Sequence, residues 1–282
     1  MILIADSGSS KTIWSLLLPS GETVTCRTSG INPFYLDVPE IISMLRAEYT
    51  LMQTGITAVF FYGAGCTPAR KTVLREALHD FFGVERMEIN SDLLGTARAM
   101  CRDKPGIACI LGTGSNSCYY DGIDIVENVS PLGYVLGNEG GGDALGKKLL
   151  SDVLKKQLPE TIRDAFFSSC KLSAEDILER IYRQPFPNRF LASFTHFIAA
   201  HIAVPELEQL VEHSFREFFV RNVLQYQQAK MLPLYFTGSV AYVFQRQLYR
   251  VAEALGMEIK EVVQTPMEGL REYHWGELII NN

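Results

Sequence analysis

The feature that most constrains the fold is a plan that occurs twice along the chain. Near the N-terminus the apolar run Ile2–Ala5 leads into the polar turn Asp6–Thr12, a second apolar run and a further turn at Pro19–Gly21. The same order returns from Ile107, where an apolar run enters the turn Gly112–Ser117. Each half begins strand, tight turn, strand, turn, strand, and this repetition predicts two related domains.

The rest of the chain alternates between helix and strand periodicity. Strands are expected at 58–62, 87–89, 234–237 and 257–263. Helices are expected at 39–52, 68–82, 92–101, 174–182, 205–230, 240–255 and from 266 to about 275, with Thr67 and Ser173 as N-caps and Gly83 as a stop. Mixed sheets covered by helices in two lobes follow, which is an α/β architecture.

The charged, turn-forming segment Asp103–Gly106 suits a hinge between these lobes. We expect an N-terminal lobe at 1–105 and a C-terminal lobe at 106–282, with a helical insertion at about 140–230. Whether the last helix packs back on the N-terminal lobe is left open.

Composition narrows the class of protein. Of the 282 residues, 47% are hydrophobic and 21% are charged, which is typical of a globular chain with a full core. The net charge of -6 and the lack of a dense Lys/Arg run argue against a nucleic-acid partner. No apolar run reaches the ~18 residues of a membrane span. The six cysteines form no C-x-x-C and the first apolar stretch follows no basic segment, so we expect a cytoplasmic protein with reduced thiols.

Two common nucleotide motifs are absent. The segment Gly141–Lys148 approaches a Walker A loop, but Lys148 stands where a Ser or Thr would ligate magnesium, and the segment has helical rather than loop character. No G-x-G-x-x-G follows a strand, so a Rossmann dinucleotide site is unsupported.

The two hairpins are the stronger phosphate candidates. Gly8 and Gly114 permit close approach of the backbone to an anion. Hydroxyls that could donate to phosphate oxygens follow in both turns, namely those of Ser9, Ser10, Thr12, Thr113 and Ser115. Two ordinary tight hairpins are the alternative.

Two charged residues flank the first turn. Asp6 ends the first strand, where a carboxylate near phosphates requires a cation such as Mg²⁺. A turn-capping role is the alternative for Asp6. Lys11 is equally compatible with a phosphate contact and with a solvent-facing position.

These motifs carry a resemblance to a known family. Asp6–Thr12 resembles the first phosphate motif of the acetate kinase/sugar kinase/Hsp70/actin superfamily. Together with Leu111–Asn116 it is similar to the BadF/BadG/BcrA/BcrD-type ATPase and N-acetylglucosamine kinase family. Supporting segments occur in family order at Ser29–Pro33, Tyr62–Gly65, Ser91–Asp92, Gly137–Gly140 and Phe236–Ala241.

The resemblance implies a duplicated ribonuclease H-like fold whose inter-domain cleft closes on ATP–Mg²⁺ and a sugar. It assigns the phosphates to Gly8, Ser9, Ser10, Lys11 and Thr12 together with Gly112, Thr113, Gly114 and Ser115. It assigns the adenosine to Gly238, Ser239 and Val240, the metal to Asp6, and the sugar to Asn32, Gly63, Ala64, Asn138 and Glu139. Asp92 matches the catalytic aspartate of the family.

Two of these positions need comment. Asp92 follows a short strand and begins a helix, so it can project from a fixed element as a base, although a helix cap or dipole partner is the alternative. Asn138 stands where the sugar-kinase pattern usually has Asp, which removes a charged acceptor of sugar hydroxyls. Glu139 is either a substitute contact or a plain helix-start acid.

We therefore expect an ATP-dependent sugar kinase with a small-molecule sugar substrate, of N-acetylglucosamine kinase type. Two alternatives stay open. One is an ATPase that activates a dehydratase through an iron–sulfur cluster, for which Cys66 and Cys118 are the nearest candidate ligands. The other is a regulator that binds sugar or nucleotide without turnover. A homodimer is also left open.

Overall fold

The computed structural model describes the backbone of residues 1–280 and the side chains of residues 1–275. It divides into two compact units. The first comprises Met1–Ala108, Cys118–Val126 and the chain from Thr265 onward, and the second comprises Cys109–Ser117 and Glu127–Gln264. The chain therefore returns to the first unit with its last helix, α13 (Met267–Ile280).

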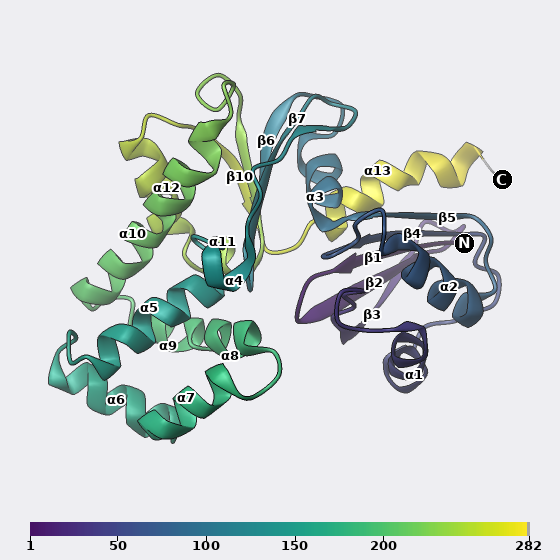
Figure 1. Ribbon diagram of the computed structural model, residues 1–282. Coiled ribbons are helices and arrows are strands. Elements are labelled where there is room, and N and C mark those ends of the chain that lie inside the picture. Colours follow the sequence, from purple (N-terminus) through teal and green to yellow (C-terminus); the bar gives the residue numbers. More distant parts are fainter. Residues whose placement is uncertain (281–282) are drawn as a thin grey trace. The chain divides into compact units, whose positions relative to one another are not determined.

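The first unit is built on a five-stranded sheet in the order β3-β2-β1-β4-β5 (Figure 1). Its strands are β1 (Ile2–Ser7), β2 (Lys11–Leu17), β3 (Thr23–Ser29), β4 (Ala58–Gly63) and β5 (Met87–Ser91). Strand β1 is antiparallel to β2 and parallel to β4, so the sheet is mixed. Strands β1 and β4 are almost continuously apolar because helices cover both faces of the sheet.

Four helices cover this sheet: α1 (Val38–Glu48), α2 (Lys71–Phe82), α3 (Asp92–Cys101) and α13 (Figure 1). Residues of α1 and α2 share one core cluster with Trp14 and Phe61. On the opposite face, the ring of His274 from α13 stacks on Phe60 at 3.9 Å. Parallel pairing sets Asp6 beside Tyr62, so the ends of β1 and β4 arrive at the same edge of the sheet.

The second sheet has the order β10-β9-β6-β7-β8. Its strands are β6 (Gly106–Leu111), β7 (Ser115–Tyr120), β8 (Ile125–Glu127), β9 (Leu234–Thr237) and β10 (Ile259–Val263). Strands β9 and β10 are parallel. The boundary between the units crosses β6, β7 and β8.

Helices make up most of the second unit. They are α4 (Gly133–Leu136), α5 (Gly142–Leu154), α6 (Glu160–Cys170), α7 (Ala174–Tyr182), α8 (Pro187–Ser193), α9 (Thr195–Ala200), α10 (Pro205–Arg221), the 3-10 helix η1 (Val223–Gln225), α11 (Ser239–Val243) and α12 (Gln245–Ala254). Helix α10 packs on the sheet through Phe218 and Phe219, whose rings contact Phe236 of β9. Two mixed five-stranded sheets flanked by helices confirm the predicted α/β class with two ribonuclease H-like lobes.

Some predicted element bounds are correct and others are wrong. Helices α3 and α7 and strand β9 have the predicted bounds. Helix α2 begins at Lys71 rather than Pro68, because a turn precedes it in which the Thr67 carbonyl accepts the Arg70 N–H at 2.9 Å. Helix α10 ends at Arg221 rather than near residue 230. A reason for this early end is Tyr226, whose hydroxyl donates to a carbonyl of β7 at 2.8 Å and ties the following chain to that strand.

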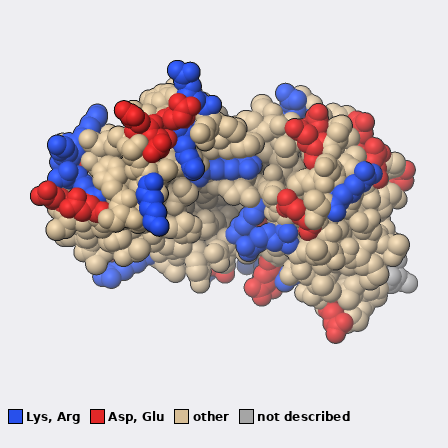
Figure 2. Space-filling model, turned by 90° about the horizontal axis from the view of Figure 1, so that it is seen from below, with Lys and Arg blue, Asp and Glu red and all other residues tan. Residues whose placement is uncertain are grey.

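Three general properties of the described residues bear on the class of protein. All six cysteines are free thiols, and four of them are buried. Among the described helices, none has the length and apolar character to span a membrane. Acidic and basic side chains are interspersed on the face shown in Figure 2.

Candidate active site

The first hairpin joins β1 to β2 through the turn Gly8–Ser10, in which the Gly8 N–H donates to the Lys11 carbonyl at 3.0 Å. Below the turn the Ser7 and Thr12 hydroxyls are 2.7 Å apart, and both residues are fully buried. The Thr12 hydroxyl also donates to the Ser29 carbonyl at 3.1 Å. Thr12 therefore braces the hairpin from inside, whereas Ser9 and Ser10 lie in the turn itself.

The predicted sugar residues of the first unit lie against this hairpin. The Ala64 N–H donates to the Ser7 carbonyl at 2.9 Å, directly after the end of β4. A Cβ on Gly65 would lie 2.2 Å from Oδ1 of Asn32, so any larger residue at position 65 would displace the Asn32 side chain. The sequence thus brings Asn32, Gly63 and Ala64 to the edge of the sheet where β1 ends.

Asp6 lies at the base of the hairpin and is tied to the end of the chain. Its Oδ2 accepts a hydrogen bond from the Thr265 hydroxyl at 3.2 Å. Burial raises the pKa of Asp6 to about 6, against the lowering effects of the Thr265 hydrogen bond and the Lys11 charge. Sequence reasoning missed Thr265, which no local motif marks.

Asp92 is the first residue of α3. The N-cap is Ser91, whose hydroxyl accepts the Leu94 N–H at 3.2 Å, so the cap alternative for Asp92 is wrong, whereas its place in the first turn of α3 agrees with the dipole alternative. The Asp92 Oδ1 accepts the Leu93 N–H at 2.9 Å. Burial, and then the negative charge of Asp6, raise the pKa of Asp92 to about 7. The electrostatic coupling means that the two carboxylates share one neighbourhood within the first unit.

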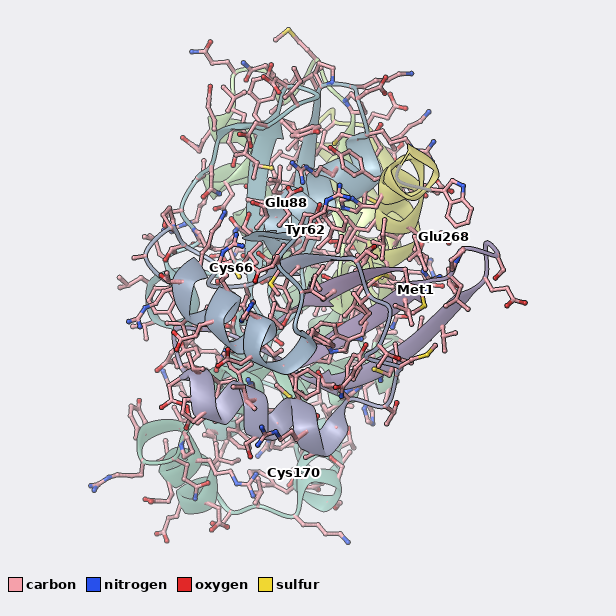
Figure 3. The ribbon with its side chains drawn as sticks, turned by 90° about the vertical axis from the view of Figure 1, so that its right-hand side faces the viewer. Met1, Tyr62, Cys66, Glu88, Cys170 and Glu268 are labelled. Atoms are coloured by element: carbon pink, nitrogen blue, oxygen red, sulfur yellow. The ribbon has the colours of Figure 1, made fainter. Side chains whose placement is uncertain are left out.

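A polar network fixes β5, and with it the start of α3. Arg98 of α3 forms an ion pair with Glu88 of β5 and donates to the Tyr62 hydroxyl at 2.9 Å. That hydroxyl also lies 2.8 Å from Nε2 of His274, and Asn90 accepts from Lys71 at 3.1 Å. Tyr62 and Glu88 lie close together in Figure 3. Asp92 therefore projects from a rigid strand–helix junction.

The second hairpin joins β6 to β7 through the turn Gly112–Gly114. The Gly112 N–H donates to the Gly114 carbonyl at 2.9 Å. The turn is tied to the start of α5, because Gly142 and Asp143 donate their N–H groups to the carbonyls of Gly112 and Thr113, each at 2.8 Å. Ser115, at the start of β7, is buried.

Three glycine segments of the second unit meet backbone to backbone. A Cβ on Gly141 would lie 2.6 Å from the carbonyl carbon of Gly114, and one on Gly238 would lie 2.2 Å from the Leu111 oxygen. Around Gly112, in contrast, a Cβ would meet nothing within 4 Å. Packing therefore requires glycine at 114, 141 and 238, whereas Gly112 leaves space that a ligand can use.

The predicted adenosine residues Gly238, Ser239 and Val240 stand where β9 passes into α11. The Gly238 N–H donates to the Val263 carbonyl at 3.1 Å, which links this junction to β10. Val240 is buried and Ser239 is exposed. Close packing of Gly238 on Leu111 brings the junction to the foot of the second hairpin.

The turn before α5 carries Asn138 and Glu139. Asn138 has a left-handed backbone with φ of 59°, and its amide Nδ2 donates to Oδ2 of Asp143 at 2.7 Å. Glu139 pairs with Arg221 of α10 at 2.7 Å. Burial raises the pKa of Asp143 to about 7. Sequence reasoning missed Asp143, although a carboxylate directly after three glycines was a signal that could have found it.

The donor set limits how a metal could bind. Among the described side chains, no group of three or more His, Cys, Asp and Glu residues could hold a metal ion. Asp6 nevertheless offers a hard oxygen donor at the foot of the first turn. Mg²⁺ commonly takes one or two carboxylates and completes its shell with water and phosphate oxygens, so Asp6 fits such an ion.

Similarity to a known protein establishes the family of the chain. No family model and no curated protein matches it. A solved structure from Porphyromonas gingivalis, provisionally named an N-acetylglucosamine kinase, is 49% identical, with a TM-score of 0.94 over 98% of this chain and 99% of that one. The chain belongs to the BadF/BadG/BcrA/BcrD-type ATPase and N-acetylglucosamine kinase family. It is accordingly a phosphotransferase of the sugar-kinase class, with an alcohol group as acceptor.

More distant structures share the fold. A second provisionally named N-acetylglucosamine kinase, from Chromobacterium violaceum, has 16% identity and a TM-score of 0.74, covering 96% of this chain and 98% of that one. A ROK family glucokinase from Streptomyces griseus, solved with glucose and AMPPNP, has 13% identity and a TM-score of 0.57, covering 99% and 98%. At these identities the likeness describes the architecture alone.

Proposed function

We propose that this family member transfers the γ-phosphoryl group of ATP to a hydroxyl of an amino or N-acetylamino sugar, with Asp92 as the base. The observation that carries the proposal is a pair of partly buried carboxylates, Asp6 and Asp92, near the foot of the first hairpin. Burial raises the pKa of both groups, and the negative charge of Asp6 raises the pKa of Asp92 further. The name of the relative from Porphyromonas gingivalis supports the choice of sugar.

Asp92 has the properties that such a base needs. Phosphoryl transfer passes through a loose transition state, so the base mainly orients the acceptor hydroxyl and takes its proton late. The hydroxyl oxygen forms the new bond to phosphorus, the bond from phosphorus to the ADP oxygen breaks, and the proton goes to the Asp92 carboxylate. A pKa of about 7 leaves Asp92 largely ionised at slightly alkaline pH and basic enough to accept that proton.

The hairpins supply the binding groups in this proposal. Gly8, Ser9, Ser10 and Lys11 from one turn, and Gly112, Thr113 and Gly114 from the other, bind phosphate oxygens, with Thr12 and Ser115 supporting the turns. Gly238, Ser239 and Val240 contact the adenosine. Asn32, Gly63, Ala64, Asn138 and Glu139 belong to the acceptor site. Asp6 holds Mg²⁺ directly or through water, and the ion when bound neutralises phosphate charge.

The iron–sulfur alternative gains no support from the cysteines considered for it. Cys66 and Cys118 are both buried, and burial raises the pKa of Cys66 to about 12. A cluster ligand must be a thiolate and, in an activator that shares its cluster between subunits, must reach the surface. Cys66 lies among packed side chains in the first unit (Figure 3).

The test is ADP release from ATP with glucosamine, N-acetylglucosamine, N-acetylmuramic acid and glucose as acceptors. We expect an amino or N-acetylamino sugar to stimulate release well above ATP alone. Asp92→Asn should abolish that stimulation while ATP binding, followed by calorimetry, is retained. Asp164→Asn, an exposed aspartate of α6, is the matched control and should behave as the parent. A flat response to all four sugars would contradict the proposal and favour a regulator that binds without turnover.

A further inference from the structure

A buried amide–carboxyl pair, Asn138 and Asp143, lies beside the second hairpin in the second unit. Asn138 stands at the position that usually carries Asp, and five residues later Asp143 lies in the first turn of α5. The Asn138 amide donates to Asp143 at 2.7 Å, and the two residues are only 9% and 1% exposed. The carboxyl group absent from position 138 is therefore present directly beside it, carried by another residue.

The backbone holds both partners. The Asn138 N–H donates to the Pro131 carbonyl and its carbonyl accepts from Gly141, each at 2.9 Å. The Asp143 N–H donates to the Thr113 carbonyl at 2.8 Å. The Asn138 side chain also covers Gly114, where an added Cβ would come within 2.6 Å of Nδ2. The pair is thus built onto the second hairpin.

When Asp143 is ionised, above its raised pKa of about 7, the pairing fixes which way the Asn138 amide faces. An asparagine side chain can present either its carbonyl or its NH₂ group, whereas an ionised carboxylate only accepts hydrogen bonds. With Nδ2 directed at Asp143, Oδ1 is the end of Asn138 that is left to accept. An Asn in this orientation offers a sugar hydroxyl the same kind of acceptor as the Asp of the family pattern.

The Asp143 carboxylate is itself incompletely satisfied. Its Oδ1 is buried and has no hydrogen-bond partner among the described residues. Native structures leave few buried polar atoms unpaired, and such atoms are costly to retain.

We propose that Asp143 is a positioning residue for acceptor recognition: by accepting the Asn138 amide N–H, it fixes Asn138 so that its carbonyl oxygen accepts a hydrogen bond from a hydroxyl of the acceptor sugar. The inference rests on the proposed function, because it assigns Asn138 to the sugar site. It adds a residue outside the Gly137–Gly140 motif and a reason why Asn is tolerated within it.

The experiment exchanges the two residues. Asp143→Asn lets the Asn138 amide adopt either orientation, and Asn138→Asp places two carboxylates in contact. Each single variant should bind the acceptor more weakly, so that the dissociation constant for N-acetylglucosamine, measured by calorimetry, rises by about tenfold. The double variant Asn138→Asp/Asp143→Asn rebuilds the pair with its members reversed and should return to within about threefold of the parent. Asp152→Asn, on the same helix α5, is the control and should leave the constant unchanged.

The other readouts separate positioning from folding. ATP affinity and Tm should change little in the double variant. Normal acceptor binding by Asp143→Asn, or a double variant no better than the singles, overturns the inference. So does a parallel loss of acceptor binding, ATP binding and Tm. If a single variant does not fold, the acceptor dissociation constant of the double variant tests the inference instead. If the parent protein neither binds nor phosphorylates any sugar, the proposed function fails and this inference fails with it, whereas an active parent with unaffected variants removes the inference alone.

Discussion

The two hairpins share a backbone plan and differ in their charges. Both turns are closed by a glycine N–H that donates to a carbonyl across the turn, from Gly8 at 3.0 Å and from Gly112 at 2.9 Å. The first has Asp6 on its own strand and Asp92 nearby. At the second, the buried carboxylate of Asp143 is engaged by an amide. In the proposed function the repeated plan serves binding in both units, whereas the reacting carboxylates belong to one of them.

The buried carboxylates of the first unit also lower its stability. Asp6 and Asp92 each have a pKa raised by burial, and the charge of Asp6 raises that of Asp92 further. Two such carboxylates destabilise the folded first unit when they are ionised. The proposed function explains this cost, because in it Asp6 binds a cation and Asp92 accepts the proton of the acceptor hydroxyl.

The largest effect is expected from Asp92→Asn. The amide cannot take the acceptor proton, so kcat should fall by about 10³-fold, within the usual range for loss of a general base. The KM for ATP should change by less than about threefold, because the substitution leaves both turns intact. Steady-state ADP release measures both constants. A kcat within tenfold of the parent would show that Asp92 is not the base.

A smaller effect separates the two glycines of the second turn. Gly112→Ala places a methyl group where nothing lies within 4 Å, so Tm should be unchanged while the KM for ATP rises by about tenfold through a clash with phosphate. Gly114→Ala places its Cβ 2.6 Å from Asn138, so Tm itself should fall. Thermal unfolding and ATP kinetics on both variants provide the check. Equal losses of Tm in the two variants would contradict the conclusion that Gly112 borders open space and Gly114 is closely packed.

A third effect concerns stability and pH. Between the ordinary aspartate pKa of 3.8 and the raised value of about 7, the folded protein keeps a proton on Asp92 that the unfolded chain has released. The contribution of Asp92 to stability therefore falls as pH rises through this window. Asp92→Asn removes the penalty, so its Tm should exceed that of the parent by about 3 °C more at pH 8 than at pH 5. A constant Tm difference across pH would show that Asp92 has an ordinary pKa.

Local features of the fold were predictable from the sequence. Both hairpins and helix α3 follow from short-range patterns, since turn residues, strand alternation and a helix start are written within a few positions. Alternation also explains Thr12, which pairs across the hairpin with Ser7 and directs its hydroxyl inward with that of its partner. Because successive side chains of a strand point to opposite faces, the Thr12 hydroxyl points into the hairpin rather than toward a ligand at the turn.

The partners of the carboxylates were not predictable in this way. Thr265 meets Asp6 across 259 positions of sequence, and only the return of α13 to the first unit brings them together. Asp143 lies in a segment that was considered only as a failed Walker A loop. Its contact with Asn138 depends on the left-handed turn between them, which a single-sequence pattern does not specify. Residues that tune a site from another element leave no local signal.

The smallest effect tests that remote tuning of the first hairpin. Thr265→Val keeps the shape of the side chain and removes the hydroxyl that donates to Asp6 at 3.2 Å. Because this hydrogen bond lowers the pKa of Asp6, its loss should raise that pKa and weaken the hold on a cation. The Mg²⁺ concentration for half-maximal ADP release should rise by about threefold, as expected for one neutral hydrogen bond. Thr265→Ser keeps the hydroxyl and should match the parent. If the valine and serine variants give the same Mg²⁺ dependence, the Thr265 hydroxyl serves only to accept the Met267 N–H at the start of α13. The pKa of Asp6 would then be set by burial without a contribution from Thr265.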